Sequence, residues 1–325
     1  MAHRKVEEEI ERLAALCREG PSPAALAVLR KALADRVNLM VAKAARLAGE
    51  SHMAELLPNL LAAFDRLMEK PVERDPQCWG KNAIAAALVA LDYRESPPFL
   101  RGARHVQMEP VWGGESDTAV TLRGICLLAL PGCSDLRREE VLRCLVDALT
   151  EREHTVRLEA VRAIAQMEGP EAPLLLRFKA RVGDDESSVI GQVFDSLLRL
   201  EGAESLRFLA GFLQSKKQEV REEAALALGA SRLPAAVDLL REALEAARDP
   251  QFREVLMRAL SASRLTEAIG FLLEIFRGGR PADSAAALAA LELHCETPAI
   301  WSLVQTAMDS KASGGWRPES EERRL

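Results

Sequence analysis

The residues best suited to binding chemistry lie in one stretch of the chain, residues 75–124. It holds two of the four tryptophans, the sole tyrosine and a histidine, together with several arginines and carboxylates. Indole and guanidinium groups are the side chains that most often anchor a partner at a binding surface. The stretch therefore predicts a partner-binding surface. Its candidate residues are Trp79, Lys81, Arg101, Arg104, His105, Gln107, Trp112, Asp117 and Arg123.

Arg101, Arg104 and His105 are spaced i, i+3 and i+4, so they share one face if this segment is helical. Cations at that spacing repel one another by about 0.2–0.5 kcal/mol unless an anion lies between them. We expect the arginines to engage an acidic group, namely a carboxylate on a protein partner. The alternative is internal, because carboxylates of the same stretch, such as Glu109 and Asp117, can satisfy the same charges.

Two glycines of this stretch indicate a close approach by another element. Leu-Arg-Gly occurs at 100–102 and again at 122–124, both times within a helical pattern. Glycine inside a helix costs about 1 kcal/mol relative to alanine, so its presence calls for a packing or binding reason. Tight packing of adjacent helices, with Trp79 and Trp112 filling the space between them, stays open as the alternative to a binding surface.

Signatures of catalysis are absent from the sequence. It contains no G-x-S-x-G, Walker loop, H-E-x-x-H or paired C-x-x-C motif. The histidines have no neighbours at metal-ligand spacing, so we predict no catalytic residues, no metal and no cofactor. The six cysteines are interpreted as buried, reduced thiols, and Cys295 as a packed one.

Composition narrows the fold and the class of partner. Aromatic residues make up 4% of the 325 residues, which disfavours a large β-sheet and favours an all-α fold. The formal net charge of −6 disfavours a surface that neutralises many phosphates, so nucleic acid is the less favoured partner. Without an apolar signal segment or membrane span in the sequence, we expect a cytoplasmic protein.

Residues 219–229 give the clearest regular element, reading Glu-Val-Arg-Glu-Glu-Ala-Ala-Leu-Ala-Leu-Gly. Their apolar stripe falls at i, i+4, i+7 and i+8, on Val220, Ala224, Ala227 and Leu228. We expect Gly229 to end this helix with a positive φ. One such helix cannot bury its stripe alone, so the pattern predicts a covering neighbour.

The same stripe recurs along the chain at intervals of 30 to 39 residues. Its first position falls on Met40, Trp79, Thr118, Val156, Val189, Val220, Phe252 and Ala282. Four residues later come Ala44, Ala83, Leu122, Ala160, Val193, Ala224, Leu256 and Ala286, and three further on Leu47, Ala86, Ile125, Ala163, Ser196, Ala227, Ala259 and Ala289. Partner helices between these copies carry a proline near their start, at Pro58, Pro98, Pro173, Pro234 and Pro298. Such a period is typical of stacked helix pairs.

The proline-led helix followed by Val-Arg-x-x-Ala-x-x-Ala-Leu resembles the HEAT repeat, in the short version called PBS-lyase HEAT-like. The clearest copies are residues 155–165, 219–229 and 251–261. The resemblance implies a right-handed α–α superhelical solenoid of about eight helix pairs. It divides the chain into an N-terminal capping helix over 1–20, repeats over 21–309, and a disordered tail over 310–325.

In such families the arginine of Val-Arg commonly pairs with an acidic residue at the turn of an adjacent repeat. Arg157, Arg221 and Arg253 match this habit, with Asp249 among the acidic residues near the turns. The resemblance therefore implies a ladder of ion pairs between repeats. Each exposed pair is worth only about 0–1 kcal/mol.

Three functions remain open on this fold. The favoured one is a non-catalytic protein-interaction module or scaffold, whose inner helices offer a concave surface to a protein or peptide. The alternative is a protein that resembles HEAT-like DNA glycosylases, with Trp79, Trp112 and Asp117 matching by residue type only. The third, a bilin lyase, rests on the repeat alone. HEAT-like hydroxylases of deoxyhypusine are set aside because their His-Glu dyads are missing here.

Overall fold

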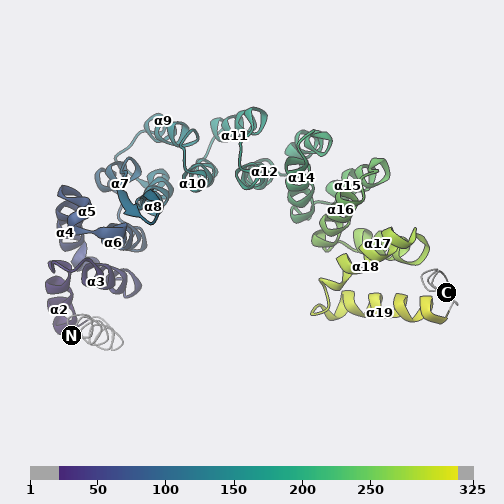
Figure 1. The fold of residues 1–325 in the computed structure, drawn as a ribbon, viewed down its shortest axis with the longest axis horizontal. Helices are drawn as coiled ribbons and strands as arrows, with labels where there is room; N and C mark the ends of the chain where they lie inside the picture. The colour runs from purple at the N-terminus through teal and green to yellow at the C-terminus, as the bar shows by residue number, and fades with distance from the viewer. Residues whose placement is uncertain (1–21, 314–325) are drawn as a thin grey trace. The chain divides into compact units, whose positions relative to one another are not determined.

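The computed structural model describes residues 22–313, and the description below is confined to them. The predicted capping helix over residues 1–20 lies outside these residues, as does the tail beyond Ser313. Within the described residues, the protein is all-α apart from one short β-hairpin (Figure 1). The fold class predicted from the sequence is thus confirmed.

Packing divides the chain into two compact units, Met1–Ala172 and Pro173–Leu325. The first unit contains α2 (Pro23–Leu33), α3 (Asn38–Glu50), η1 (Ala54–Leu56), α4 (Leu57–Glu69), α5 (Pro71–Arg74), η2 (Pro76–Cys78), α6 (Trp79–Ala90), α7 (Pro97–Ala103), β1 (Met108–Val111), β2 (Gly114–Asp117), α8 (Val120–Ala129), η3 (Leu130–Gly132), α9 (Arg138–Ala148) and α10 (His154–Ile164).

The boundary between the units falls in the first turn of α11 (Glu171–Val182). The second unit continues with α12 (Ser187–Glu201), η4 (Gly202–Ser205), α13 (Leu206–Ala210), η5 (Gly211–Gln214), α14 (Gln218–Ala230), α15 (Pro234–Ala246), α16 (Pro250–Ser263), α17 (Thr266–Gly278), α18 (Pro281–Glu292) and α19 (Pro298–Ser313). Helix α19 continues past residue 309, where the tail was expected to begin.

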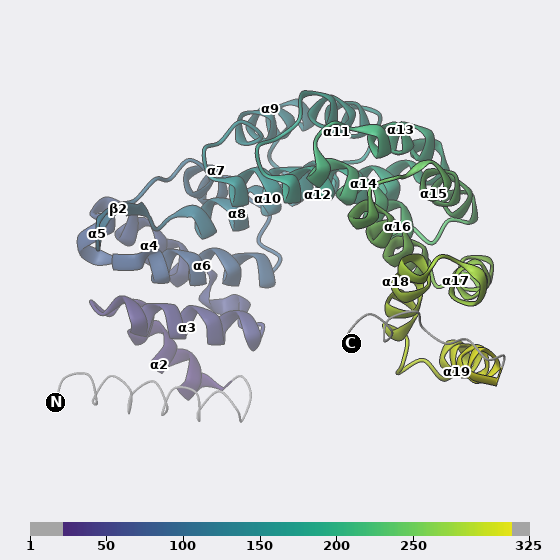
Figure 2. The same ribbon diagram turned by 45° about the vertical axis from the view of Figure 1, so that its right-hand side comes forward.

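Helices alternate between two layers within each unit. We call α3, α6, α8, α10, α12, α14, α16 and α18, which carry the repeated stripe, the B helices. The longer helices between them, such as α4, α7, α9, α11, α15 and α17, are called the A helices. In the first unit the B helices α3, α6, α8 and α10 pack in succession, and in the second unit α12, α14, α16 and α18 do the same (Figure 2). The eight B helices correspond to the eight copies predicted from the sequence.

Glycine and alanine let neighbouring B helices approach closely in the second unit. Ala224 and Ala227 of α14 are buried as predicted. Gly229, however, lies inside α14 and has no positive φ, so it does not end the helix as expected. A Cβ atom at this position would collide with the carbonyl oxygen of Ala259 in α16. The absence of a side chain at Gly229 thus permits close contact between α14 and α16 and is not needed for a turn.

Helix α6 shows that the predicted stripe can be one residue out of register. The prediction placed Trp79, Ala83 and Ala86 toward the core, but Trp79 and Ala86 are exposed and Ala83 is only half-buried. The buried positions of α6 are instead Gly80, Lys81, Ile84, Ala85, Ala87 and Leu88. One residue corresponds to about 100° around a helix, so the small side chains of the predicted stripe face away from the core.

The same one-residue slip occurs in α18. Ala282 and Ala289 are exposed, whereas Ala287, Ala290 and Leu291 are buried. Both α6 and α18 are so rich in alanine that side-chain size barely distinguishes one helix face from another. The position of the core side is then decided by contacts with neighbouring helices.

A β-hairpin interrupts the helix pair formed by α7 and α8. Strands β1 and β2 are antiparallel, and Met108 is paired with Asp117 and Val111 with Gly114. The turn between them consists of Trp112 and Gly113, and Gly113 adopts a φ of +90° that suits glycine. The sequence pattern predicted helices on both sides of this insertion but not the hairpin itself. Among residues 22–313, no helix is long and apolar enough to cross a membrane.

Candidate functional site

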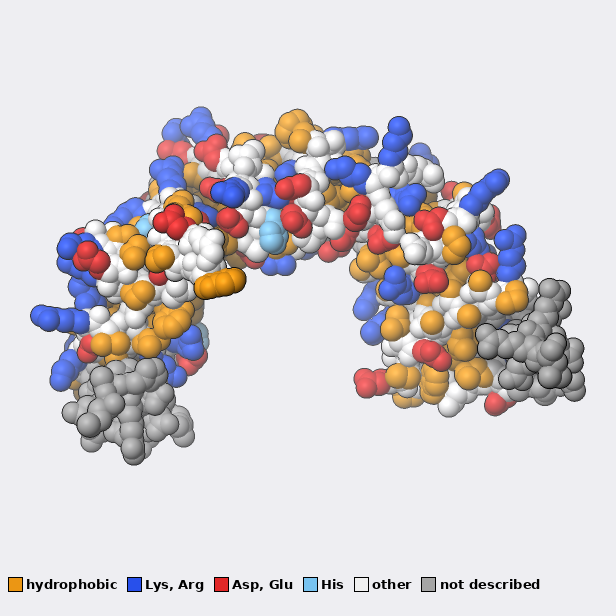
Figure 3. Space-filling view, viewed as in Figure 1, with side chains coloured by type: hydrophobic (Ala, Val, Ile, Leu, Met, Phe, Trp, Pro, Cys, Tyr) orange, Lys and Arg blue, Asp and Glu red, His pale blue; other side chains and the backbone are white. Residues whose placement is uncertain are grey.

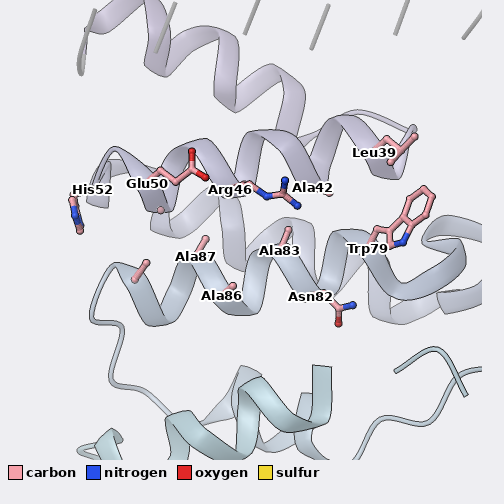
Figure 4. A pocket seen from close by; sticks show the side chains of 12 residues that line it. Leu39, Ala42, Arg46, Glu50, His52, Trp79, Asn82, Ala83, Ala86 and Ala87 are labelled. Carbon is pink, nitrogen blue, oxygen red and sulfur yellow. The ribbon is translucent and has the colours of Figure 1, made fainter. Parts of the chain in front are cut away.

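A groove of about 730 Å³ lies between the B helices α3 and α6 of the first unit. Figure 4 shows its two sides, with Arg46 and Glu50 on α3 and Trp79 and Asn82 on α6. Its lining residues are Leu39, Ala42, Arg46, Gly49, Glu50, His52, Trp79, Asn82, Ala83, Ala86, Ala87 and Ala90. Hydrophobic side chains gather over these two helices in the space-filling view (Figure 3). The groove therefore presents an apolar floor with polar groups along the α3 side.

The floor is shallow because the two helices approach closely through small residues. A Cβ atom added to Gly49 of α3 would lie 3.1 Å from the Cα atom of Ala87 in α6. No long side chain fits between the helices at that point, and alanines line the surface above it. Trp79, with 48% of its surface exposed, stands at the start of α6 as the largest side chain of the groove.

Asp75 fixes the start of α6 and thereby the position of Trp79. Its carboxylate accepts hydrogen bonds from the backbone N–H groups of Gly80, at 2.7 Å, and Lys81, at 2.9 Å. The ammonium group of Lys81 lies 3.1 Å from the same carboxylate, and both side chains are fully buried. Asn38 of α3 donates a further hydrogen bond to Asp75 at 2.9 Å. The start of α6 is thus tied directly to α3, across the groove.

Gln107 and Glu109 extend this buried network to the hairpin. The Gln107 side-chain amide donates to the Asp75 carbonyl oxygen at 2.9 Å and to the Glu109 carboxylate at 2.5 Å. Glu109 also accepts from the Thr118 hydroxyl at 2.6 Å and from the backbone N–H of Gln77 at 2.8 Å. Burial alone would raise the pKa of Glu109, but these hydrogen bonds outweigh it and hold the pKa below its usual range.

Asp117, at the end of β2, and Arg123 of α8 complete the network at the same open end of the hairpin. The Arg123 guanidinium donates to the Asp117 carboxylate at 2.6 Å and to the carbonyl oxygen of His105 at 2.8 Å. Asp117 also accepts from the backbone N–H groups of Gln107 and Ala119. Burial acts to raise the pKa of Asp117, and these backbone hydrogen bonds together with Arg123 lower it overall. An internal pair between an arginine and a carboxylate of this stretch is therefore present, but it involves Arg123 and not Arg101 or Arg104.

The predicted cationic face is divided by the end of a helix. Helix α7 ends at Ala103, so Arg104 caps it and His105 lies beyond it. Arg101 forms an ion pair with Asp65 of α4, and Arg104 lies 3.9 Å from the sulfur of Cys144 in α9. Burial lowers the pKa of His105, whose Nε2 is 3.2 Å from the Gln107 side chain. The three residues do not form a single face.

Of the nine predicted site residues, Lys81, Gln107 and Arg123 are buried, with at most 1% of their surface exposed. They are corrected here from direct contacts to parts of an internal network, because a partner cannot reach them in this structure. His105 and Asp117 are partly exposed and belong to the same network. Four remain well exposed, namely Trp79, Arg101, Arg104 and Trp112.

These four exposed residues point to different parts of the first unit. Trp79 lies in the groove beside α3, whereas Arg101 is held against α4. Trp112 stands at the tip of the hairpin, fully exposed to solvent. Gly102 packs against the next helix, since a Cβ there would collide with the sulfur of Cys126 in α8. The close approach inferred for this glycine is thus contact between adjacent helices.

The sequence pattern did not indicate that α3 residues line the groove. Ala42, Arg46 and Glu50 are spaced i, i+4 and i+8 along one face of α3, where Ala42 is buried and Arg46 and Glu50 are exposed. This spacing was visible in the sequence, but nothing in it indicated that α6 would turn Trp79 toward the same side. Only the packing of α6 on α3 brings the two faces together.

The expected ladder of arginine pairs is present in part. Arg221 lies 3.5 Å from Asp249, and Arg253 lies 2.9 Å from Asp283 rather than from Asp249. Arg157 donates to the carbonyl oxygens of Glu151 and Arg152. These arginines therefore serve contacts within and between repeats.

The cysteine thiols are not all buried, contrary to the expectation from the sequence. Cys78, Cys126 and Cys133 are buried, and burial raises the pKa of the Cys78 thiol to about 12. Cys295 is exposed, contrary to the expectation of a packed thiol, because it lies in the turn after α18. Across residues 22–313, no group of three or more His, Cys, Asp or Glu side chains is arranged to hold a metal ion.

Comparison with known proteins identifies the repeat. The family model described as HEAT repeats matches residues 178–261 and 205–292. Residues 178–292 are therefore similar to HEAT repeats, and the resemblance seen in the sequence is confirmed. No curated protein sequence matches the chain.

Two solved structures show a distant likeness. Human deoxyhypusine hydroxylase in complex with glycerol is 20% identical over 94% of this chain and 88% of its own, with a TM-score of 0.25. The complex of CpcE and CpcF of phycocyanin lyase from Nostoc sp. PCC7120 is 18% identical over 90% of this chain and 96% of its own, with a TM-score of 0.32. At TM-scores below 0.5, neither likeness carries an argument about activity.

Proposed function

We propose that this protein is a non-catalytic interaction module that binds an extended segment of another protein in the groove between α3 and α6. The observation that carries the proposal is the exposure of Trp79 at the rim of an apolar groove. A tryptophan beside such a groove is the kind of side chain that dominates binding energy at protein interfaces. Small side chains along the floor leave room for the backbone of a bound segment.

The polar residues of the groove favour a protein segment that carries acidic and apolar side chains. Arg46 lies beside the apolar floor, and guanidinium groups form their strongest hydrogen bonds with carboxylates. The buried network supports this role indirectly, since it fixes the start of α6 through Asp75 and Lys81. An anchor held in place before binding loses less conformational entropy when a partner binds.

Nothing in the geometry favours the glycosylase alternative. Asp117 already accepts hydrogen bonds from Arg123 and from two backbone N–H groups, so both of its carboxylate oxygens are engaged. Trp112, the second aromatic residue of that hypothesis, stands at the hairpin tip rather than in the groove with Trp79.

The proposal is tested by selecting peptides that bind the immobilised full-length protein from a displayed peptide library. Selected peptides are then measured by fluorescence anisotropy against the wild type, Trp79→Ala and Ala86→Glu. We expect both variants to weaken binding at least tenfold, because one removes the anchor and the other places a charge on the floor of the groove.

Two further variants serve as matched controls. Trp112→Ala removes an exposed tryptophan from the same unit, and Arg101→Ala with Arg104→Ala removes the exposed cations. Unchanged affinity in both is expected. Loss of binding in either control, with Trp79→Ala unaffected, would move the binding surface to the hairpin or to the A helices.

A further inference from the structure

Helix α11 carries an exposed apolar face in addition to the apolar side that is buried in the core. Leu174, Phe178 and Val182 are spaced i, i+4 and i+8, which places them on one side of the helix. Each has about two-thirds of its surface exposed, at 64%, 65% and 66%. A group of hydrophobic side chains is visible over α11 in Figure 3. The opposite side of the helix is buried in the usual way, through residues such as Leu176.

Two other A helices of the second unit, α15 and α17, do not share this feature. In α15 and α17, every residue is described and no large hydrophobic side chain is exposed. Contiguous exposed apolar side chains on a soluble domain commonly mark an interaction site. The outer face of α11 is therefore a candidate for contact with another molecule, independent of the groove between α3 and α6.

Charges at the two ends of this face are arranged symmetrically. Glu171 lies three residues before Leu174, and Arg181 lies three residues after Phe178. The face thus reads Glu-x-x-Leu-x-x-x-Phe-x-x-Arg, with the same spacing in both directions from its midpoint. A twofold rotation about that midpoint brings an apolar residue onto an apolar residue and an acid onto a base.

We propose that α11 pairs in antiparallel orientation with α11 of a second copy of this chain. Leu174 of each copy then packs on Phe178 of the other, and Glu171 of each faces Arg181 of the other. A twofold interface uses the same surface on both subunits, so a self-complementary face is what such an interface needs. The two ion pairs at the ends would fix the register of the helices.

Present contacts of the two charged residues are compatible with this pairing. Arg181 is exposed, and its guanidinium lies 5.0 Å from the ring centre of Phe208 and 5.7 Å from that of Phe212. Stacking on rings orients the guanidinium without covering the side chain. Glu171 is 2.9 Å from Arg138, and half of its side chain remains exposed. Both charges are therefore accessible at the ends of the apolar face.

The contact involves one helix from each copy and is small. Interfaces below about 1,200 Å² are typical of weak or transient association. Dimers are therefore expected to form in a concentration-dependent way, without a permanently dimeric protein at high dilution. Sedimentation velocity of the full chain over a range of concentrations measures this directly.

A charge-reversal experiment tests the register. Glu171→Arg alone and Arg181→Glu alone each create two like-charge contacts in the homodimer, so each variant is expected to be monomeric at concentrations where the wild type associates. Mixing the two variants restores both opposite-charge contacts in the heterodimer. We therefore expect the mixture to associate about as well as the wild type. Glu245→Arg, an exposed change of the same size on α15, should leave association unchanged.

Three outcomes would overturn the proposal. A wild type that stays monomeric at all concentrations has no such dimer, and the face must then serve a different protein. Association that persists in both single variants places the interface elsewhere. A mixture that fails to associate, although circular dichroism shows both variants folded, shows that Glu171 and Arg181 do not meet across a twofold axis.

Discussion

The two units of this protein differ in the side chains that lie between their B helices. In the first unit, α6 and α8 bury charged side chains, with Lys81 beside Asp75 and Arg123 beside Asp117. In the second unit, α14 and α16 meet through small residues, and Gly229 lies directly against the backbone of Ala259. Small residues thus permit close contact between B helices in both units, as at Gly49 and Gly229. The first unit differs because it also encloses the charged pairs of Lys81 and Arg123.

This difference explains where the candidate site lies. Buried hydrogen-bond networks specify a single arrangement, because an unpaired member is costly in a low-dielectric interior. In the first unit, the network holds the hairpin and the start of α6, and so sets the direction of Trp79. The second unit also encloses polar contacts, such as Ser261 with His294 and Lys179 with Asp184. Its exposed apolar face on α11 follows from the helix pattern.

The largest effect is expected from removing Arg123. Arg123→Ala leaves the Asp117 carboxylate, of which only 10% is exposed, without its cation. Breaking a buried pair in this way typically costs about 3–5 kcal/mol. Hydrogen exchange should show loss of protection in the hairpin and α8, while α14 and α16 keep theirs.

The matched control for this change is Arg101→Ala. Its ion pair with Asp65 is exposed on both sides, so a change of about 0–1 kcal/mol is expected. If the two substitutions lower stability equally, burial of the Arg123 pair does not make it more stabilising than an exposed pair. The difference inferred between the two units would then be wrong.

An intermediate effect is expected from Gly229→Ala in the second unit. The added methyl group would collide with the Ala259 carbonyl oxygen, and overpacking of this kind typically costs about 1–3 kcal/mol. Gly270→Ala in α17 is the matched control, because a Cβ there meets nothing within 4 Å.

Alanine loses less backbone conformational freedom on folding than glycine does, so Gly270→Ala should be more stable than the wild type by about 0.5–1 kcal/mol. Urea denaturation followed by far-ultraviolet circular dichroism compares the two variants. Stabilisation by both substitutions would mean that α14 and α16 can separate slightly at no cost.

The smallest effect is expected from pH. Asp117 and Glu109 have lowered pKa values, so the stability that they contribute is present above their ordinary pKa and is lost as pH falls through the lowered one. Partial desolvation raises the pKa of Asp195, although this residue is exposed at the surface. Desolvation together with the Asp195 charge raises the pKa of Glu223. These two groups bind protons more readily in the folded state, so the second unit should become more stable as pH falls from 7 toward their unfolded pKa values.

Hydrogen exchange, corrected for the pH dependence of its intrinsic rate, separates the two units in this experiment. Asp195→Asn combined with Glu223→Gln should abolish the gain in the second unit and leave the first unchanged. A gain that persists in the double variant would assign it to other carboxylates.

Residue types and spacing were enough to predict the helical repeats but not every helix face. Val220, Ala224 and Ala227 define a stripe because the residues around them are mostly charged, and the structure buries both alanines. In α6 and α18, alanines occur on several faces, so the pattern did not determine which face is buried. The hairpin was missed because its strands are only four residues long and lie between helical segments.

For the candidate site, the sequence drew attention to residues 75–124 and to Trp79, but it did not indicate which of the polar residues are buried. Lys81, Gln107 and Arg123 are polar, and polar residues in an irregular repeat were expected to face a partner. Their burial depends on Asp75, Glu109 and Asp117 being close to them in space. Such proximity is set by long-range contacts, which spacing along the chain does not reveal.

The sequence by itself determined the all-α repeat architecture, because a stripe that recurs about once per helix pair must be covered by its neighbour. Tertiary structure alone decided which charges are enclosed and which side chains line the groove. The physical reason is that helical period depends on neighbouring residues in sequence, whereas burial of a charge depends on a partner supplied by another element. Trp79 illustrates both points. The sequence marked it as a candidate binding residue, and the packing of α6 on α3 places it in the groove.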